Sequence, residues 1–252
     1  MTIVDVPVAE PSTSGAAADR PWSARFAAVA GQHRDVAVDV SEIEASRLLA
    51  ECGPSLATFQ LGETGTGEHL FAAARIAGVD DDYLAALRAF VVEEQEHARM
   101  LGLLLDAIAQ PRRRSHWSDR IFVVLRRFRS LRTEVLTLLV AELVAVRYYS
   151  ALAAGTRVAA LSELCGRIHA DELRHLDFHA DTLPEHLRRF GPVAGVIVRL
   201  AWNALVVVAS VLVAADHGRA LASVGCTRRR FVADLWSLRR DLDRRLFGPP
   251  PS

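Results

Sequence analysis

Apolar residues recur at helical spacing along most of the chain after residue 40. In the stretch 81–109, for example, Leu84, Leu87, Phe90 and Val91 fall on one side of a helix, as expected for an amphipathic helix with a buried face. No segment alternates convincingly between apolar and polar residues, as a strand with one exposed face would. The pattern therefore predicts an all-α protein.

Glycine, proline and capping residues divide this pattern into a series of helices. Ser41 and Glu44 match a capping box, which opens a short helix that Gly53 and Pro54 end. We expect a later helix to end before Pro184, because proline lacks the backbone N–H that a continuing helix uses. The predicted longer helices span residues 54–77, 81–109, 130–154, 158–181, 192–217 and 227–246.

The helical pattern does not include residues 1–20, which are rich in alanine, proline, serine and glycine. Such a composition is typical of a disordered tail. Residues 21–54 form a predicted N-terminal helical extension, and residues 183–252 a C-terminal helical extension that packs on the central part of the chain. That central part, residues 55–182, carries the candidate chemistry.

Composition narrows the classes of function. The 30 basic residues balance 30 acidic ones, so the net charge is zero and nucleic acid is not an expected partner. Cys52, Cys165 and Cys226 are odd in number and far apart, which suggests neither a disulfide framework nor a zinc site. The N-terminus lacks the basic region and apolar run of a secretory signal. We therefore expect a cytoplasmic protein.

Two short motifs place glutamate and histidine inside apolar helices. In FVVEEQEHARML, Glu94 and His97 are three residues apart, so both lie on one helix face. The stretch HADELRHLDF repeats this spacing with Glu172 and His175. With 14 glutamates and nine histidines in 252 residues, about half of one such pair is expected by chance. The motif alone is therefore weak evidence for a site.

A glutamate upstream of each motif strengthens the case. Glu63 precedes Glu94 by 31 residues, and Glu142 precedes Glu172 by 30. In an antiparallel helix pair, two residues that are equally far from the connecting turn lie at the same height along the helices. The midpoint between Glu63 and Glu94 and the midpoint between Glu142 and Glu172 both fall in predicted turns. We therefore expect the two halves to bring four glutamates and two histidines together in the middle of one bundle.

Such a cluster needs a counter-charge, because each unpaired buried carboxylate would cost several kcal/mol, on the order of the stability of a whole domain. Two divalent cations would balance four carboxylates, and neutral imidazoles would complete the ligand sets. Oxygen donors with two nitrogens suit iron or manganese better than a metal that prefers thiolates. Carboxylate-bridged metal pairs of this kind are known in four-helix bundles.

The stretches LGETGTGEHL, FVVEEQEHARML, VAELVAVRYYSAL and DELRHLDFH resemble the ferritin-like di-iron carboxylate proteins, in particular a bacterial group of ferritin-like domain proteins whose reactions are mostly unassigned. The resemblance covers residues 55–182. It implies a ferritin-like four-helix bundle, here with additional C-terminal helices, that holds two iron ions, with manganese or a mixed iron–manganese pair as alternatives. The six metal ligands that it implies are Glu63, Glu94, His97, Glu142, Glu172 and His175.

The resemblance also implies an activity. The wider superfamily includes oxygenases, desaturases and ferroxidases. We expect an oxidase or oxygenase that uses O2 and an electron donor to oxidise a small, apolar organic substrate. A ferroxidase or another iron-handling protein is the alternative.

Several acids near the motifs leave alternatives open. Glu68 is an alternative ligand to Glu63, although its interval to the first motif matches the second half less well. By the resemblance, Asp171 holds one of the ligand histidines, with His97 across the bundle as the candidate, and Glu93 occupies the matching position in the first half. The alternative is that both acids are surface residues that pair with an arginine.

Two further features have both a packing and a functional interpretation. Tyr149 follows Glu142 by about two helical turns, so it either lines the site or belongs to the core. Gly62, Gly65 and Gly67 stand where a helix is predicted, although each glycine costs about 1 kcal/mol there relative to alanine. They indicate either close helix packing or a local distortion that leaves space beside the site.

The predicted helix 192–217 is apolar almost all round. Apart from Ser210, its longest apolar stretch has 12 residues, between Asn203 and Asp216. A helix that spans a membrane needs about 20. We therefore favour a buried packing helix or the interface of a homodimer over membrane contact through residues 192–215.

Overall fold

The computed structural model describes residues 20–115, 130–187 and 191–248. These residues form helices and connecting segments without any strand, so the predicted all-α class is confirmed. The predicted disordered tail lies outside the described residues except for Arg20. The helices are α2 (Trp22–Ala27), α3 (Glu42–Glu51), α4 (Gly53–Gly62), α5 (Glu68–Ala77), α6 (Asp81–Ala107), α8 (Leu131–Gly155), α9 (Ala159–Leu187), α10 (Pro192–Asp216), α11 (Gly218–Ser223) and α12 (Arg228–Phe247).

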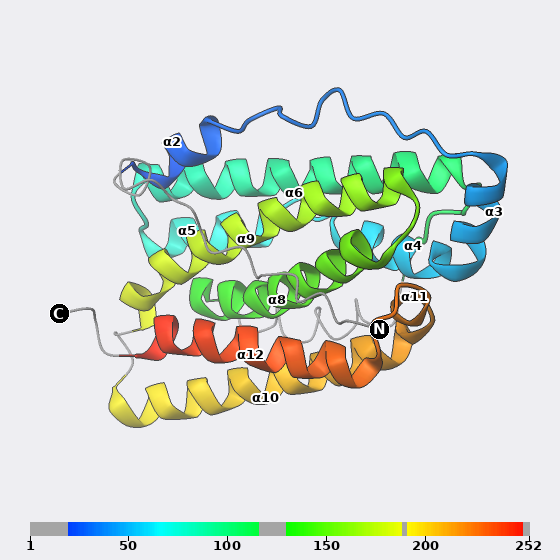
Figure 1. The fold of residues 1–252 in the computed structure, drawn as a ribbon. Helices are drawn as coiled ribbons and strands as arrows, with labels where there is room; N and C mark the ends of the chain where they lie inside the picture. Colours follow the sequence, from blue (N-terminus) through cyan, green and yellow to red (C-terminus); the bar gives the residue numbers. More distant parts are fainter. Residues whose placement is uncertain (1–19, 116–129, 188–190, 249–252) are drawn as a thin grey trace.

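Three long helices and one broken helix form the core of the molecule (Figure 1). α8 packs extensively along α9, and α6 packs on α9. α4 packs on α6 and α5 on α8, so that together they take the place of a fourth long helix. The apolar faces meet in one cluster, whose largest fully buried side chains include Tyr148, Tyr149 and Phe90.

Side chains cap the N-termini of several of these helices by hydrogen bonding to backbone N–H groups. Ser41 and Glu44 form the predicted capping box at the start of α3. Asp80 accepts a hydrogen bond from the backbone N–H of Tyr83 at the start of α6, and Ser130 caps α8 in the same way. Each cap satisfies a backbone N–H that has no partner within the helix.

The prediction of one helix over residues 54–77 is wrong, because the structure divides it into two. α4 ends at Gly62 and α5 begins at Glu68. Between them, Gly67 adopts a left-handed backbone with a φ of 70°, which costs glycine little and other residues more. A Cβ added at Gly62 or Gly65 would meet no atom within 4 Å, so these glycines mark a distortion of the helix and not close packing.

α9 also extends further than predicted. It continues through Pro184 to Leu187. A proline near the end of a helix removes one backbone hydrogen bond. Leu183 and Leu187 are buried on either side of it, and their apolar packing holds the final turn.

The N-terminal extension runs along α6. α2 packs on α6, and the chain then follows the length of α6 to reach α3 (Figure 1). Ser23 of α2 donates a hydrogen bond to Asp82 in the first turn of α6. Only α2 and α3 of this extension are helical before α4 begins, and residues 28–41 connect them.

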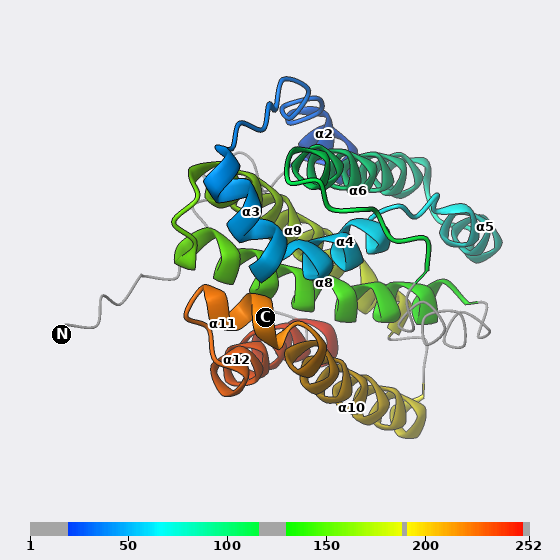
Figure 2. The ribbon, with the colours of Figure 1, turned by 90° about the vertical axis from the view of Figure 1, so that its right-hand side faces the viewer.

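α10 and α12 form an outer layer on the side of the molecule away from α6 (Figure 2). The two helices run antiparallel, and α12 packs on α8 and α9, whereas α10 packs on α12 and α8. Of the two interpretations favoured for α10, the buried packing helix is wrong, because only 17% of the most apolar 18-residue window of Val193–Asp216 lies inside the molecule. The interface of a homodimer stays a prediction. α8 is also long and apolar enough to cross a membrane, but 78% of its corresponding window is buried.

Candidate metal centre

The six residues predicted as ligands come together in the middle of the bundle, and we call them the ligand cluster. One helical turn separates the two members of each Glu-x-x-His pair, so both side chains leave the same helix face. The members are Glu94 and His97 of α6, Glu142 of α8, Glu172 and His175 of α9, and Glu63, which directly follows α4.

The donor atoms of the ligand cluster form two overlapping groups, and within each group they lie within 4.8 Å of one another. Glu94 and Glu172 belong to both groups. Two ions in these groups would therefore share two carboxylates, as in a bridged dinuclear centre. The first group is Glu63, Glu94, His97 and Glu172, and the second is Glu94, Glu142, Glu172 and His175.

Both histidines turn the same ring nitrogen toward the carboxylates. Nδ1 of His97 lies 3.6 Å from Glu94 Oε1 and 3.5 Å from Glu172 Oε1. Nδ1 of His175 lies 3.1 Å from Glu94 Oε1 and 3.5 Å from Glu142 Oε2. In each ring, Nε2 points to a carboxylate outside the ligand cluster. Each ring thus presents one nitrogen to the cluster and one to an outer partner.

Most atoms that face one another in the ligand cluster are shielded from solvent and make no hydrogen bond. Burying polar atoms in this way is costly unless a metal ion or another partner satisfies them. Carboxylate oxygens with imidazole nitrogens form a donor set that suits several divalent metals, so these residues fit a metal site. The atoms are Glu94 Oε1, Glu142 Oε2, Glu172 Oε1 and Oε2, His97 Nδ1 and His175 Nδ1.

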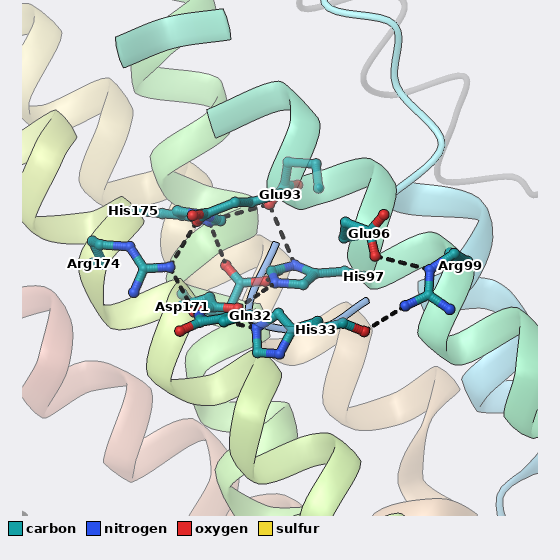
Figure 3. Close-up of polar contacts among 11 residues, drawn as sticks. Gln32, His33, Glu93, Glu96, His97, Arg99, Asp171, Arg174 and His175 are labelled. Atoms are coloured by element: carbon teal, nitrogen blue, oxygen red, sulfur yellow. Dashed lines mark hydrogen bonds and ion pairs between the residues drawn. The ribbon is translucent and has the colours of Figure 1, made fainter. Parts of the chain in front are cut away.

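Asp171 lies beside the outer nitrogen of His97, in the position that the resemblance suggests. Asp171 Oδ2 is 3.2 Å from His97 Nε2. The same oxygen is 2.6 Å from His33 Nε2, and Oδ1 accepts a 2.9 Å hydrogen bond from Gln32 Nε2 (Figure 3). Arg174 donates a further hydrogen bond of 2.6 Å to Oδ1. Asp171 therefore joins the N-terminal extension to the ligand cluster.

The sequence analysis missed Gln32 and His33. They lie in a turn without helical periodicity, and 138 residues separate His33 from Asp171, so no local pattern indicates the contact. Arg99 of α6 donates a 2.6 Å hydrogen bond to the backbone oxygen of His33 and a 2.8 Å hydrogen bond to Glu96. These contacts hold the segment in place beside α6 (Figure 3).

Glu93 is the outer partner of the second histidine. Its Oε2 lies 2.9 Å from His175 Nε2 and accepts a 2.8 Å hydrogen bond from Arg174. Asp171 and Glu93 each precede the glutamate of one motif and contact the histidine of the other. Arg174 contacts both acids, so one guanidinium joins the two halves (Figure 3). Neither acid is an exposed surface residue, although both pair with an arginine.

Tyr149 both lines the ligand cluster and belongs to the core. Its hydroxyl donates a 2.7 Å hydrogen bond to Glu63 Oε1. Burial and then the charge of Glu63 raise the pKa of Tyr149 well above its usual value, so the phenol keeps its proton for this bond. The hydroxyl of the neighbouring Tyr148 instead contacts Ser55, whose Oγ lies 2.7 Å from His217 Nδ1.

Aromatic rings cover the ligand cluster beside His175. The Phe90 ring packs edge-on against His175 with centroids 4.7 Å apart, and the Phe26 ring of α2 lies at 6.1 Å. His179, one turn further along α9, is buried against Phe90 and Phe178. Burial and the charge of His175 lower the pKa of His179 to about 3, so this ring is neutral. The wall on this side is apolar.

Burial raises the pKa of Glu63 and of Glu142 well above the usual value, and the negative charges of Glu94 and Glu172 add to the shift. Burial acts in the same direction on Glu94 and Glu172. Their contacts with neighbouring proton donors, His175 and His97 among them, outweigh burial and lower the pKa of both, that of Glu172 to about 2. Ionisation is therefore favoured in the two shared glutamates and disfavoured in Glu63 and Glu142.

Burial alone would lower the pKa of His97 and His175. The carboxylates around the two rings outweigh burial and raise the pKa of both well above the usual value. The carboxylates therefore favour the protonated form of both rings in the metal-free protein. A metal ion that binds Nδ1 would compete with that proton.

Two other glutamates, the alternative ligand Glu68 and Glu134 of α8, lie outside both groups. Glu68 is exposed in the first turn of α5, and Glu134 lies two turns before Glu142 on α8. Neither belongs to a group of donor atoms that could hold an ion among the described residues. Glu63 belongs to one of the two groups and Glu68 to neither, and the role of Glu63 as a metal ligand stays a prediction.

Comparisons with models of protein families, with curated proteins and with solved structures give no match. The resemblance to ferritin-like proteins accordingly stays a prediction. The case for a metal centre rests on the geometry of the ligand cluster and its outer partners.

Proposed function

We propose that the protein is a non-haem di-iron oxidase or oxygenase that uses O2 to oxidise a small organic substrate. The observation that carries the proposal is the pair of overlapping groups that share Glu94 and Glu172 and contain buried donor atoms without hydrogen bonds. Two divalent ions would neutralise four carboxylates in an interior where burial and neighbouring negative charges raise the pKa of two of them.

Iron in this centre would supply the electron-transfer chemistry with O2 that side chains alone lack. The protein supplies the positions of the donor atoms. Each group of four residues would hold one ion, and the two shared glutamates would contact both.

The outer partners orient the ligands before a metal arrives. Asp171 and Glu93 lie within hydrogen-bond distance of Nε2 of the two histidines, which directs Nδ1 of each ring into the ligand cluster. Tyr149 donates to Oε1 of Glu63 and so orients this carboxylate at the end of α4. Preset ligand positions reduce the reorganisation that metal binding requires.

The surroundings of the ligand cluster suit a small substrate. Phe26 and Phe90 exclude water beside His175, which limits side reactions of a strong oxidant. Glu94 keeps 17% of its side chain exposed, which marks a side from which small molecules could enter. Gly67 lies against Val91, one turn before Glu94, and a Cβ added at Gly62 or Gly65, just before it, would meet no atom within 4 Å.

A ferritin-like bundle is part of the same proposal. The broken helix α4–α5, then α6, α8 and α9 follow one another along the chain. Each Glu-x-x-His motif stands on the second helix of a pair, and a single glutamate comes from the first. This order supports the assignment.

Iron content after anaerobic loading tests the proposal. Wild-type protein loaded with Fe²⁺ and desalted should retain about two irons per chain. The double variant Glu172→Ala/His175→Ala should lose most of this iron, whereas Glu68→Ala should retain it, because Glu68 is exposed outside both groups. Wild-type protein without stoichiometric iron, or equal iron in wild type and the double variant, would overturn the ligand assignment.

A ferroxidase or iron-handling protein is the second candidate, because the partly exposed Glu94 offers entering iron a route to the same centre. Excess Fe²⁺ under O2 separates the two. An oxidase that keeps iron as a cofactor should oxidise about two ions per chain and then stop, because its centre is filled. Continued oxidation of many ions per chain would favour iron handling.

A further inference from the structure

α10 leaves a long apolar stripe uncovered. At 1.5 Å per residue, its 25 residues give the helix a length of about 37 Å. Six of the thirteen large apolar side chains exposed among the described residues lie on it, so they form a patch and are not scattered. These six, which we call the α10 stripe, are Val193, Val196, Ile197, Leu200, Val208 and Val211.

The opposite face of α10 is packed against the molecule. Trp202 and Val206 are buried there, and Trp202 Nε1 donates a 3.1 Å hydrogen bond to the backbone oxygen of Leu136 in α8. Arg199 donates hydrogen bonds to both carboxylate oxygens of Asp243 in α12. α10 would lose these contacts if it left the molecule to cross a bilayer. It can present the α10 stripe to a partner without losing any of them.

α12 places arginine and tryptophan beside the stripe. Successive helix residues turn by about 100°. Arg229, Trp236 and Arg240 therefore share the sector of α12 next to Asp243, the residue that contacts α10. All three are exposed, and the guanidinium of Arg239 lies 4.1 Å from the centre of the Trp236 ring.

Charge is unevenly distributed along the chain. Residues 191–248 contain nine arginines, four aspartates and no glutamate, whereas the whole chain balances 30 basic against 30 acidic residues. The C-terminal layer thus has an excess of positive charge, and the rest of the chain has the same excess of negative charge. An apolar helix face with a rim of arginine and tryptophan complements a lipid surface with anionic headgroups.

We propose that the α10 stripe, together with Arg229, Trp236 and Arg240, binds peripherally to an anionic lipid bilayer, with α10 parallel to the membrane plane. The stripe enters the boundary between headgroups and acyl chains, and Trp236 lies at the level of the headgroups. The two arginines contact lipid phosphates. Figure 2 shows α6 on the far side of the molecule, so the bundle stands above the bilayer.

A second copy of the chain matches this surface less well. In a two-fold dimer through the α10 stripe whose axis runs across α10, the arginines beside the stripe in the two copies would approach one another. Arg229 and Arg240 form no ion pair among the described residues, so the like charges would face each other without compensation. The rim therefore favours lipid over a dimer.

Sedimentation with vesicles tests the proposal. Wild-type protein should bind phosphatidylcholine vesicles that contain phosphatidylglycerol, and added salt should weaken this binding. Ile197→Ser/Leu200→Ser/Val208→Ser should reduce the partition into vesicles about tenfold or more, because three apolar side chains no longer enter the lipid. The matched control is Ile43→Ser/Ile76→Ser, since both isoleucines are 83% exposed elsewhere on the molecule.

A second variant tests the contribution of Arg229 and Arg240 beside the α10 stripe. Arg229→Gln/Arg240→Gln should lower binding to phosphatidylglycerol vesicles by about fivefold for each charge removed. It should also flatten the salt dependence, because fewer charges remain to be screened.

Two outcomes would overturn the proposal. One is the absence of binding to phosphatidylglycerol vesicles, or equal binding by wild type and the stripe variant. The other is a wild-type dimer in light scattering that the stripe variant converts to a monomer, without vesicle binding. Circular dichroism and iron content of the variants should match wild type, because the stripe is exposed and lies outside the ligand cluster, so this test is independent of the proposed function.

Discussion

Glu142 lies in the middle of a continuous helix, α8, whereas Glu63 lies where α4 stops. Each precedes a Glu-x-x-His motif by about the same number of residues, so the two are equivalent positions in the repeated halves of the sequence. Each also belongs to one of the two groups of donor atoms. The backbone of Glu142 is fixed by helical hydrogen bonds on both sides. Glu63 is followed by a turn and depends on the hydroxyl of Tyr149 for its orientation. The same spacing thus yields one rigidly held and one less constrained carboxylate.

The outer partners of the two histidines differ in the same way. Glu93, beside His175, also contacts Arg174, whereas Asp171, beside His97, contacts Gln32 and His33 in addition to Arg174. The half with the less constrained glutamate is therefore the half that the N-terminal extension reinforces. The comparison teaches that matching positions in two halves do not imply equal mechanical support.

Removing a shared ligand should have the largest effect. Glu172→Ala should reduce the iron retained after anaerobic loading from about two ions per chain to almost none, because both groups lose a donor. Glu63→Ala and Glu142→Ala should each retain about one ion, since each removes a donor from one group. Metal analysis of the three variants would contradict the shared arrangement if Glu172→Ala kept as much iron as the other two.

Removing an outer partner should weaken binding without abolishing it. Asp171→Asn and Glu93→Gln should each lower Fe²⁺ affinity by roughly 10- to 100-fold, because a ligand histidine loses its orienting carboxylate. We expect the larger loss for Asp171→Asn, since Asp171 also holds His33 and Gln32. Anaerobic titration measures both, with Glu163→Gln as the control, because Glu163 is an exposed acid of α9 that pairs with Arg167 on the surface. Equal losses would show that the N-terminal contacts add nothing to the centre.

Both the stability of the metal-free protein and its affinity for metal should depend on pH, because residues of both halves bind protons in the ligand cluster. Glu63, Glu142, His97 and His175 all have a raised pKa, so each stabilises the metal-free fold below its unfolded pKa, and this stability is lost as the pH rises through the folded value. Metal binding displaces the same protons, so affinity should rise by about tenfold per pH unit for each proton released.

Thermal unfolding with and without metal provides the measurement. The rise in Tm on adding metal should be larger at about pH 8 than at about pH 6. At the higher pH the metal-free protein is less stable than at the lower pH, and the metal binds more tightly. A rise in Tm that is independent of pH, together with no proton release in a weakly buffered titration, would contradict the assignment of protons to these four residues.

We expect the smallest difference in iron affinity between variants of the two adjacent tyrosines, Tyr148 and Tyr149. Tyr149→Phe should weaken iron binding a few-fold, because Glu63 loses the hydrogen bond that orients it. Tyr148→Phe removes a hydroxyl that contacts Ser55, so it should cost about 1 kcal/mol of stability and leave iron affinity unchanged. Iron titration and chemical denaturation of both variants check this. An equal effect of the two on affinity would mean that Tyr149 has no special role at Glu63.

The spacing of charged residues in the sequence was enough to predict which residues meet. Helical periodicity and intervals of 31 and 30 residues place Glu63 with Glu94 and Glu142 with Glu172, because antiparallel helices obey simple geometry. The same periodicity gave the long helices to within a few residues. What it could not give was the end of α4 at Gly62, where the surrounding packing decides whether the glycines interrupt a helix.

The sequence could not predict the contacts that irregular segments make or which helix faces stay exposed to solvent, because both depend on the packing of distant parts of the chain. His33 reaches Asp171 through a turn whose path depends on the packing of α2 and α3, and no period in the sequence encodes that path. The hydropathy of α10 shows that it is apolar but not which neighbours cover it. The structure leaves the α10 stripe exposed because α8 and α12 occupy only the opposite side of the helix.

Each half of the ligand cluster is completed by the other. The first group takes Glu172 from the second half, the second group takes Glu94 from the first, and each histidine is oriented by an acid from the opposite motif. A shorter chain with only one Glu and one Glu-x-x-His could thus build this centre only by associating with a second copy of itself about a two-fold axis. The internal repeat gives one polypeptide the symmetry of such a dimer, and Arg174, which has no counterpart in the first motif, is where that symmetry is broken.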